Sequence, residues 1–330
     1  MTDAASRRAP SPVKNEISLG DAIPQTTLES RRASGDSHGY MNLASRTVTR
    51  REALQTLGFL TLAAAPVLSA VAASKPKRRM ALQLYTLREP AQKDLADTLK
   101  RVRQMGWEYV QWSGMPNLPA EKIRAALDTA GLKAISAHVG IEPFERDFET
   151  NVKFWKTVGV GDLAPGGMMN DCRATLKDWL NGARRLETLG AKLRATGLRL
   201  SYHNHAWEFE KFPDDPRYKL DILLESTTPG HLCAELDLAW IYVGGVDPAA
   251  YIRKCKGRCP VIHAKDVVLA KQGRKQAFTP LGQGELNWSE IFAAGDAAGI
   301  EWYVYEQDSG VGSPFDYAQA SYEFLVKWMQ

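Results

Sequence analysis

Residues 120–139 have the sequence AEKIRAALDTA-GLKAISAHV: an amphipathic stretch, one glycine and a short β-rich run. The apolar spacing predicts a helix over 120–130, ended by a glycine in the left-handed conformation, and then a strand over Lys133–Val139. The same step from helix to glycine to strand recurs at Gly106 and Gly299. This unit decides the fold class, because strands that alternate with helices form parallel sheets.

Eight such alternations fill the chain from Met80 onward. The predicted strands are Ala81–Leu87, Tyr109–Trp112, Lys133–Val139, Gly161–Ala164, Leu198–Asn204, Leu232–Leu236, Val261–Lys265 and Trp302–Glu306. The predicted helices are Leu95–Met105, Ala120–Ala130, Phe148–Val158, Ala174–Ala195, Pro216–Ser226, Pro248–Cys255, Trp288–Ala298 and Phe315–Met329. Eight units in about 250 residues match a (β/α)₈ barrel. A doubly wound sheet is the alternative, but the first strand leads into Tyr85-Thr86-Leu87-Arg88 rather than a G-x-G-x-x-G loop.

The composition is that of a soluble globular protein. Of 330 residues, 44% are apolar and 24% are charged, and the net charge is only +4. A nearly neutral chain argues against nucleic acid as a main partner, because phosphate binding needs a basic face. Four cysteines are too few for a disulfide scaffold, although Cys255 and Cys259 lie close enough in sequence to pair in an oxidised protein.

The first eighty residues differ from the rest. Residues 1–45 have no helical or strand periodicity and are predicted to be a disordered tail. Residues 46–73 contain the pair Arg50-Arg51, a short apolar run and a small-residue stretch, the order of a twin-arginine export signal. The alternative is a short buried helix flanked by chance arginines.

The apolar run is too short for a permanent membrane span. Residues 74–79 are predicted to be a linker, and residues 80–330 the barrel domain. Because Met41 stands just ahead of the arginine pair, it is a better initiator for such a signal than Met1. The expected location is the periplasm.

Polar side chains collect where the predicted strands end, which is where barrels carry their active sites. These residues are Gln83, Trp112, His138, His203, His205, Glu208, Asp237, Trp240, His263, Lys265, Glu306 and Asp308. Four of the six histidines of the chain belong to this set. Chemistry is therefore expected at the carboxyl ends of the strands.

A divalent cation is the first prediction for this site. Glu208, Asp237, His263 and Glu306 come from four successive strand ends, and one imidazole with three carboxylates suits such an ion. Three carboxylates packed together would repel one another without a cation. The period of two along the fifth strand directs both His203 and His205 into the barrel mouth. One of these two histidines is alternatively an orienting donor rather than a reacting group.

Several of these segments resemble one known family. The motifs are Tyr202-His203-Asn204-His205-Ala206-Trp207-Glu208-Phe209, Glu235-Leu236-Asp237-Leu238-Ala239-Trp240, His263-Ala264-Lys265-Asp266, Gly282-Gln283-Gly284-Glu285-Leu286-Asn287-Trp288 and Tyr305-Glu306-Gln307-Asp308. They look like the sugar phosphate isomerase/epimerase family with its xylose isomerase-like TIM barrel, in the branch marked by YHNHxxEF. The resemblance covers about 79–330 and implies that Glu208, Asp237, His263 and Glu306 hold one divalent ion, with Mn²⁺ first and Mg²⁺, Co²⁺ or Zn²⁺ as alternatives.

The implied reaction is isomerisation or epimerisation of an unphosphorylated sugar or keto sugar through an enediolate. The expected catalytic residues are Glu208, Glu306, His203 and His205. The expected substrate-binding residues are Gln83, Trp112, His138, Trp240, Lys265 and Asp308. Simple barrel packing is the alternative role for Trp112 and Trp240.

Other functions are weighed beside this one. A metal-held enediolate can also expel a group from the neighbouring carbon, so a lyase acting on a 3-keto-glycoside is the first alternative. A non-catalytic sugar-binding protein is the second. Endonuclease IV shares the barrel, but it needs more histidines and a DNA-binding face. A homo-oligomer is possible.

Overall fold

Eight parallel strands close into a barrel in the computed structural model, which describes residues 78–113, 116–270 and 276–329. The barrel strands are β1 (Arg79–Gln83), β2 (Tyr109–Trp112), β3 (Lys133–His138), β4 (Asp162–Ala164), β5 (Arg199–His203), β6 (Cys233–Asp237), β7 (Val261–Ala264) and β10 (Trp302–Tyr305). Their order around the barrel is β1-β10-β7-β6-β5-β4-β3-β2, and neighbours are hydrogen-bonded. The predicted (β/α)₈ fold is confirmed. The predicted tail and export signal lie outside the described residues.

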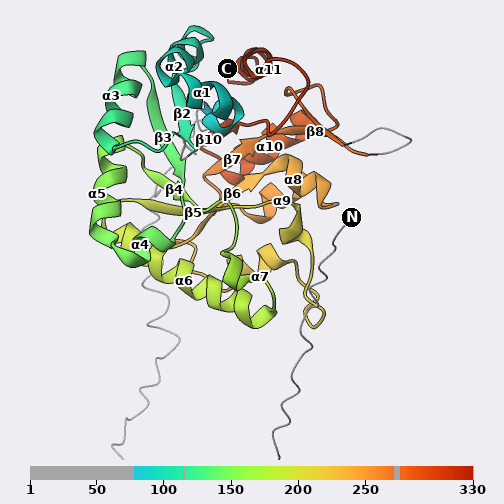
Figure 1. The fold of residues 1–330 in the computed structure, drawn as a ribbon. Coiled ribbons are helices and arrows are strands. Elements are labelled where there is room, and N and C mark those ends of the chain that lie inside the picture. Colours follow the sequence, from blue (N-terminus) through green and yellow to red (C-terminus); the bar gives the residue numbers. More distant parts are fainter. Residues whose placement is uncertain (1–77, 114–115, 271–275, 330) are drawn as a thin grey trace, which may run out of the picture. The chain divides into compact units, whose positions relative to one another are not determined.

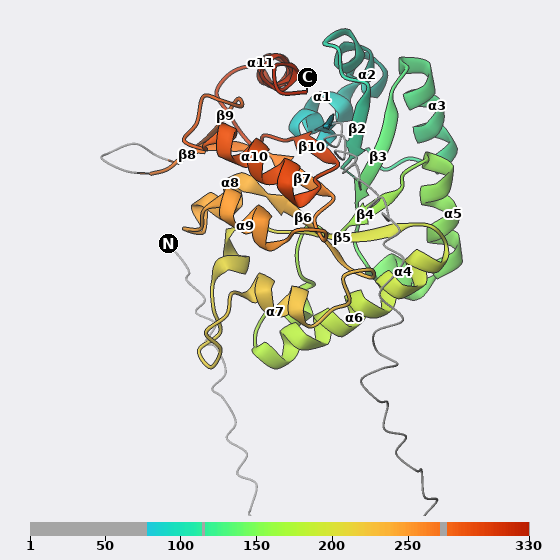
Figure 2. The ribbon, with the colours of Figure 1, turned by 180° about the vertical axis from the view of Figure 1, so that it is seen from behind.

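Helices surround the barrel on its outer side, as Figures 1 and 2 show from opposite directions. They are α1 (Arg88–Lys93), α2 (Leu95–Gln104), α3 (Ala120–Ala130), α4 (Glu142–Arg146), α5 (Phe148–Val158), α6 (Leu176–Ala195), α7 (Lys219–Glu225), α8 (Leu238–Val243), α9 (Pro248–Lys254), α10 (Trp288–Ala298) and α11 (Pro314–Val326). Three 3₁₀ turns, η1 (Leu84–Leu87), η2 (Asn170–Cys172) and η3 (Ala206–Phe209), follow strand ends or precede helices. No helix in the described part of the chain is long and apolar enough to cross a membrane.

The unit at residues 120–139 forms as its sequence predicts. In α3, Ala120, Ile123 and Leu127 are buried, which places one apolar stripe on the barrel. The helix ends at Gly131, whose φ of +71° is the left-handed conformation that a side chain would disfavour. The chain then turns directly into β3.

Three local features differ from the sequence prediction. The first strand stops at Gln83 instead of Leu87, because the Gln83 side chain accepts a hydrogen bond from the Tyr85 backbone N–H and η1 begins there. A separate antiparallel hairpin, β8 (Asp266–Val268) with β9 (Ala277–Thr279), follows β7 and was not predicted. The short helices α1, α4 and α8 were also missed, since fewer than two turns leave little periodicity.

The predicted linker 74–79 overlaps the barrel at its end. Arg79 opens β1, and the Arg78 guanidinium binds the Asp296 carboxylate in α10, with Nη2 and Oδ2 2.8 Å apart. The predicted linker therefore does not extend over these two residues, although the Arg79 side chain is exposed. Because the Arg78 guanidinium pairs with the partly buried Asp296 carboxylate, it attaches this segment to α10 instead of facing solvent.

All four cysteines, Cys172, Cys233, Cys255 and Cys259, are free thiols in this structure. Cys259 Sγ instead contacts the Val261 backbone oxygen at 3.2 Å. The disulfide bond considered between Cys255 and Cys259 is therefore not formed in this structure.

Candidate metal centre at the barrel mouth

The barrel interior changes from apolar to polar along each strand. Ala81, Val261, Trp302 and Val304 form a small apolar cluster inside the barrel. Two residues further along β1, β7 and the segment after β10 stand Gln83, His263 and Glu306. Because side chains two positions apart share one face of a strand, these polar groups also face inward, nearer the carboxyl end. The apolar cluster is thus a floor beneath the polar site.

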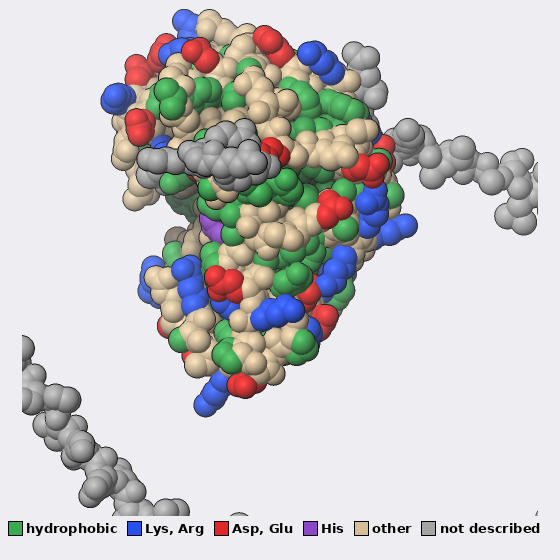
Figure 3. Space-filling model, turned by 90° about the vertical axis from the view of Figure 1, so that its right-hand side faces the viewer, with side chains coloured by type: hydrophobic (Ala, Val, Ile, Leu, Met, Phe, Trp, Pro, Cys, Tyr) green, Lys and Arg blue, Asp and Glu red, His purple; other side chains and the backbone are tan. Residues whose placement is uncertain are grey.

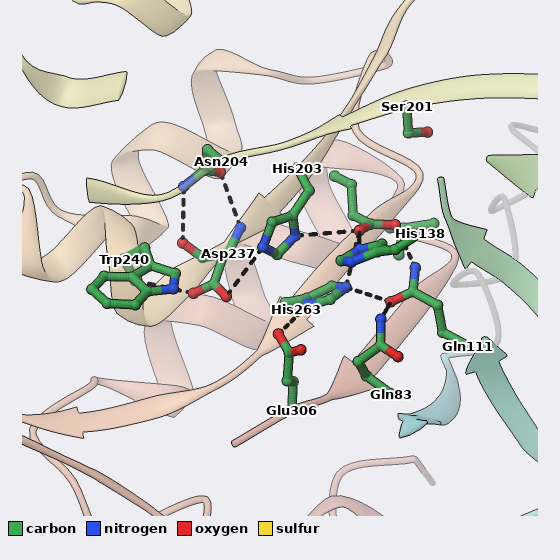
Figure 4. Close-up of polar contacts among 12 residues, drawn as sticks. Gln83, Gln111, His138, Ser201, His203, Asn204, Asp237, Trp240, His263 and Glu306 are labelled. Carbon is green, nitrogen blue, oxygen red and sulfur yellow. Dashed lines mark hydrogen bonds and ion pairs between the residues drawn. The ribbon is translucent and has the colours of Figure 1, made fainter. Parts of the chain in front are cut away.

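Four buried side chains converge above this floor. One nitrogen or oxygen atom from each of His203, Asp237, His263 and Glu306 lies within 4.8 Å of the others. A second group of the same kind, His138, His203, Glu235 and His263, shares two histidines with the first. Figure 4 shows the first group pointing toward one another from neighbouring strands. Asp237, His263 and Glu306 therefore meet as the sequence predicts.

Asp237 is held at its backbone by Asn204 and at its side chain by the first turn of α8. Asn204, directly after β5, accepts the Asp237 backbone N–H at 3.0 Å, and the Asp237 Oδ1 atom caps α8 by accepting the Trp240 N–H at 3.0 Å. Oδ2 is buried and receives no aligned hydrogen bond among the described residues. It lies 3.9 Å from His203 Nε2. Oδ1 is thus engaged by the backbone of α8, whereas Oδ2 faces the buried cluster.

Lys265 brings one positive charge to three carboxylates. Its Nζ lies 2.8 Å from Asp237 Oδ2, 2.8 Å from Glu306 Oε2 and 3.0 Å from Asp308 Oδ2. Burial would lower the pKa of Lys265, but the three carboxylates raise it above its usual value. Burial likewise would raise the pKa of Glu306, yet Lys265 and His263 hold it well below its usual range. For Asp308 burial prevails and raises the pKa to about 6.

Glu235 was not singled out from the sequence, although it lies at the centre of the buried polar side chains above the apolar floor. Its side chain is fully buried and contacts three histidines and Gln111. Burial would raise its pKa, but the neighbouring His263 and His138 hold it well below the usual value. A usable signal existed, because Glu235 is two positions before Asp237 and therefore shares its face of β6.

The two histidines of the fifth strand end are placed differently. His203 belongs to the buried cluster, whereas the partly exposed His205 lies at its edge, with ring centroids 5.2 Å apart. His205 also lies 5.6 Å from the Trp240 ring, and its Nδ1 has no hydrogen-bond partner among the described residues. Both histidines reach the barrel mouth, as predicted.

Glu208 does not join the cluster, so the predicted ligand set needs correction. Its Oε1 accepts a hydrogen bond from the Tyr202 hydroxyl at 2.8 Å, and its Oε2 accepts the His205 backbone N–H at 2.8 Å. The physical reason is η3, which coils the chain after β5 and turns Glu208 back toward the strand. Burial raises the pKa of Glu208 to about 8. His203 takes the fourth position instead.

The remaining predicted residues divide into two groups. Gln83, His138, Trp240, Lys265 and Asp308 lie at or beside the cluster. Trp112 does not, because its neighbour Gln111 faces the barrel interior and the alternation of β2 therefore turns Trp112 into the core beneath the helices, 1% exposed. Its alternative role in packing is the correct one.

The cluster itself is buried, but the residues beside it line two pockets. A pocket of about 620 Å³, lined by His205, Trp207 and Trp240 among others, lies beside it, and a second of about 390 Å³ reaches His138. Gly166 and Arg173 line both. Figure 3 shows a small histidine patch in a notch of the surface. Pockets of this volume accommodate small molecules.

The chemistry of the donor set fits a divalent cation. Two imidazoles and two carboxylates are common ligands of zinc, manganese and cobalt. Asp237 Oδ2 is buried, is paired with the Lys265 ammonium group at 2.8 Å and lies among the other three donors, where such an ion would find it. The residues present therefore suit the metal that the resemblance implied, with His203 in place of Glu208.

A family of proteins described as xylose isomerase-like TIM barrel matches residues 99–328, and the chain belongs to this family. Curated relatives include the inosose dehydratase of Geobacillus thermodenitrificans, 28% identical over 170 residues, which are 46% of this chain and 55% of that protein. The inosose dehydratase of Clostridium perfringens is 26% identical over 165 residues, 45% of this chain and 54% of that protein. The chain thus spans about half the length of these relatives.

Solved structures share the fold over most of the chain. A sugar phosphate isomerase/epimerase from Parabacteroides distasonis superposes with a TM-score of 0.65 at 22% identity, covering 76% of this chain and 98% of that one. The IolI protein, with a bound zinc atom, gives a TM-score of 0.57 at 13% identity, covering 76% of this chain and 98% of that one. At these identities the likeness describes the fold alone.

Proposed function

We propose that this protein is a metal-dependent enzyme that removes a proton next to the carbonyl of an unphosphorylated keto sugar or keto polyol. The convergence of His203, Asp237, His263 and Glu306 carries the proposal. With two imidazoles in the set, Zn²⁺, Co²⁺ or Mn²⁺ suits the site better than Mg²⁺. The zinc atom in the IolI structure is consistent with a metal centre in this fold.

When bound, the ion acts as a Lewis acid on the substrate carbonyl oxygen. The charged Lys265 side chain, 1% exposed, supplies a second positive group for the oxygen on which negative charge develops. His205 is the proposed proton acceptor, because its ring lines the larger pocket and its Nδ1 is unpartnered in the described residues. His138 and Asp308 are proposed to position substrate hydroxyl groups, whereas the fully buried Gln83 has its amide engaged by Tyr85 and Gln111.

Elimination is the outcome we favour. In this step the C–H bond next to the carbonyl and the C–O bond on the following carbon break, a C=C bond forms, and the protonated hydroxyl leaves as water. It needs one acceptor for the C–H proton and one donor to the departing oxygen. The named inosose dehydratases support this choice.

Isomerisation or epimerisation is the second candidate. Epimerisation needs proton-transfer groups on both faces of one carbon, and Glu208, one of the four residues expected to be catalytic, binds Tyr202 instead of facing the cluster. The support for this candidate is the name of the Parabacteroides protein, a sugar phosphate isomerase/epimerase.

The test uses the metal-loaded full chain in D₂O with an inosose and with free keto sugars, followed by NMR. Loss of water with a new C=C signal supports elimination, whereas deuterium incorporation without loss of water supports isomerisation or epimerisation. Glu306→Gln is expected to lower metal affinity and turnover while the fold survives. Failure of every substrate to react or exchange, with metal bound, would favour a sugar-binding protein instead.

We also propose that the chain is exported by the twin-arginine route to the periplasm. The support is the order of motifs in residues 46–73, which lie outside the described part of the structure.

A further inference from the structure

The buried carboxylate of Glu235 is the meeting point of the buried polar side chains above the apolar floor. Its Oε1 lies 2.7 Å from His138 Nε2, 3.0 Å from His263 Nε2 and 3.3 Å from His203 Nδ1. Its Oε2 accepts a hydrogen bond from Gln111 Nε2 at 2.7 Å. An ionised carboxylate only accepts hydrogen bonds, so each nitrogen that faces it is expected to carry the proton.

A chain of side-chain amides reaches this carboxylate from the backbone. The Tyr85 backbone N–H donates to Gln83 Oε1 at 3.2 Å, so the other end of this amide, Nε2, is left to donate to Gln111 Oε1 at 2.6 Å. Gln111 in turn presents Nε2 to Glu235. A backbone N–H cannot reverse its role, and it therefore fixes both amide orientations. Figure 4 shows Gln83, Gln111 and His263 in this arrangement.

The orientation of these amides determines the proton on His263. Its Nε2 lies between two acceptors, Gln111 Oε1 at 2.7 Å and Glu235 Oε1 at 3.0 Å, and must donate to them. Nδ1 lies 2.9 Å from Glu306 Oε2 and donates to it in the metal-free protein; a bound cation would replace this proton, and the lone pair of the neutral imidazole is then on Nδ1.

His203 follows the same logic with its nitrogens exchanged. Nδ1 lies 3.3 Å from Glu235 Oε1 without the alignment of a full hydrogen bond, and Nε2 is the atom that lies 3.9 Å from Asp237 Oδ2. With the proton on Nδ1, the lone pair on Nε2 faces the carboxylates.

We propose that Glu235 is a positioning residue that places one proton on the far nitrogen of each of His203 and His263. With a cation bound, both rings would thereby present a lone pair to the position between Asp237 and Glu306. The lone pair on His263 Nδ1 rests on the proposed metal function, whereas the proton on His203 Nδ1 does not. Carboxylates that hold ligand histidines in this way tune metal affinity, and their loss typically weakens binding about 10- to 100-fold.

Glu235→Gln tests the placement directly, since an amide NH₂ group must then face at least one of the donors around Glu235. One imidazole is expected to move its proton to the inner nitrogen, where the lone pair was. Glu235→Asp keeps an acceptor-only group and should preserve the tautomers. Glu208→Gln is the matched control: Glu208 is equally buried, but its hydrogen bonds go to Tyr202 and His205 rather than to the cluster.

The readout is ¹⁵N NMR of histidine-labelled full chain, metal-free and zinc-loaded, with each ring assigned by replacing it. The wild type, Glu208→Gln and Glu235→Asp should show the proton on Nδ1 of His203 and, in the zinc-loaded form, on Nε2 of His263. Glu235→Gln should lose this pattern and bind zinc about 10- to 100-fold more weakly.

A wild-type spectrum with the His203 proton on Nε2 overturns the proposal, as does an unchanged spectrum and unchanged zinc affinity in Glu235→Gln. Absence of zinc binding by the wild type instead overturns the proposed metal function, and the metal-free spectrum of His203 still decides the role of Glu235. Should Glu235→Gln fail to fold, the wild type and Glu235→Asp provide that decision.

Discussion

The ammonium group of Lys265 lies 2.8 Å from Oδ2 of Asp237, the same oxygen that faces His203 Nε2. A cation bound among the four clustered side chains would therefore be neutralised by the same carboxylates, Asp237 and Glu306, that pair with Lys265. The protein holds a permanent positive charge where a divalent ion is proposed to bind, which keeps the buried carboxylates compensated before the metal arrives.

Removing that charge should destabilise the metal-free protein. Lys265→Met leaves Asp237 and Glu306 buried without their cation, and we expect a loss of about 3–5 kcal/mol in the free energy of unfolding. Saturating Mn²⁺ or Zn²⁺ should recover much of it. Denaturant titration with and without metal measures both effects. The control Arg253→Met breaks an exposed ion pair with Glu290, 47% and 57% exposed, and should cost less than about 1 kcal/mol. Equal losses in the two variants would contradict the account.

Glu208 should make stability fall as pH rises. Its folded pKa of about 8 lies above the ordinary 4.5, so the folded state holds the proton more tightly, and the stabilisation present below pH 4.5 is lost as pH rises through 8. Glu208→Gln lacks this proton while keeping partners for Tyr202 and the His205 N–H. The difference in unfolding free energy between wild type and variant should fall by roughly 3–5 kcal/mol between pH 5 and pH 9. A pH-independent difference would refute the raised pKa.

Asp266 should be essential to the loop that carries the Gly282–Trp288 motif. Its buried carboxylate accepts hydrogen bonds from the Trp288 Nε1–H at 2.8 Å and from several backbone N–H groups. The backbone donors belong to Val267, Gly282, Gly284 and Leu286. A Cβ on Gly284 would lie 2.0 Å from Asp266 Oδ1, so only glycine permits this approach.

Asp266→Asn turns an NH₂ group toward these donors and should lower the free energy of unfolding by about 2–4 kcal/mol in a urea titration. Asn287→Ala, which removes the N-cap of α10, is the comparison and should cost only about 1 kcal/mol. If Asp266→Asn were the milder change, the carboxylate would not be what orders the loop.

Export is tested by replacing Arg50 and Arg51 with lysine in the full-length chain. Since a twin-arginine signal depends on both guanidinium groups, the periplasmic fraction should fall to background while the total amount of protein is retained. Immunoblots of cell fractions measure it. Arg46→Lys should leave export intact. Unchanged periplasmic yield in the double variant would contradict the proposal.

The contrast between Glu235 and Glu208 shows what the sequence could predict of the site. Asp237, His263 and Glu306 were found because each lies in a regular strand or directly after one, where strand alternation still relates position to direction. Glu235 was accessible by the same rule, two positions before Asp237. Glu208 was not, because it lies in a 3₁₀ turn after β5, where no period relates position to direction. The hairpin β8–β9 was missed for a related reason: three-residue strands are too short to show alternation.

The central claim is that His203, not Glu208, completes a metal site with Asp237, His263 and Glu306. Anomalous X-ray diffraction from crystals grown with Mn²⁺ or Zn²⁺ tests it most directly. The account predicts one strong anomalous peak at about 2.0–2.3 Å from His203 Nε2, Asp237 Oδ2, His263 Nδ1 and a Glu306 carboxylate oxygen. A peak bound by the Glu208 carboxylate, or none between these four side chains at saturating metal, would contradict it.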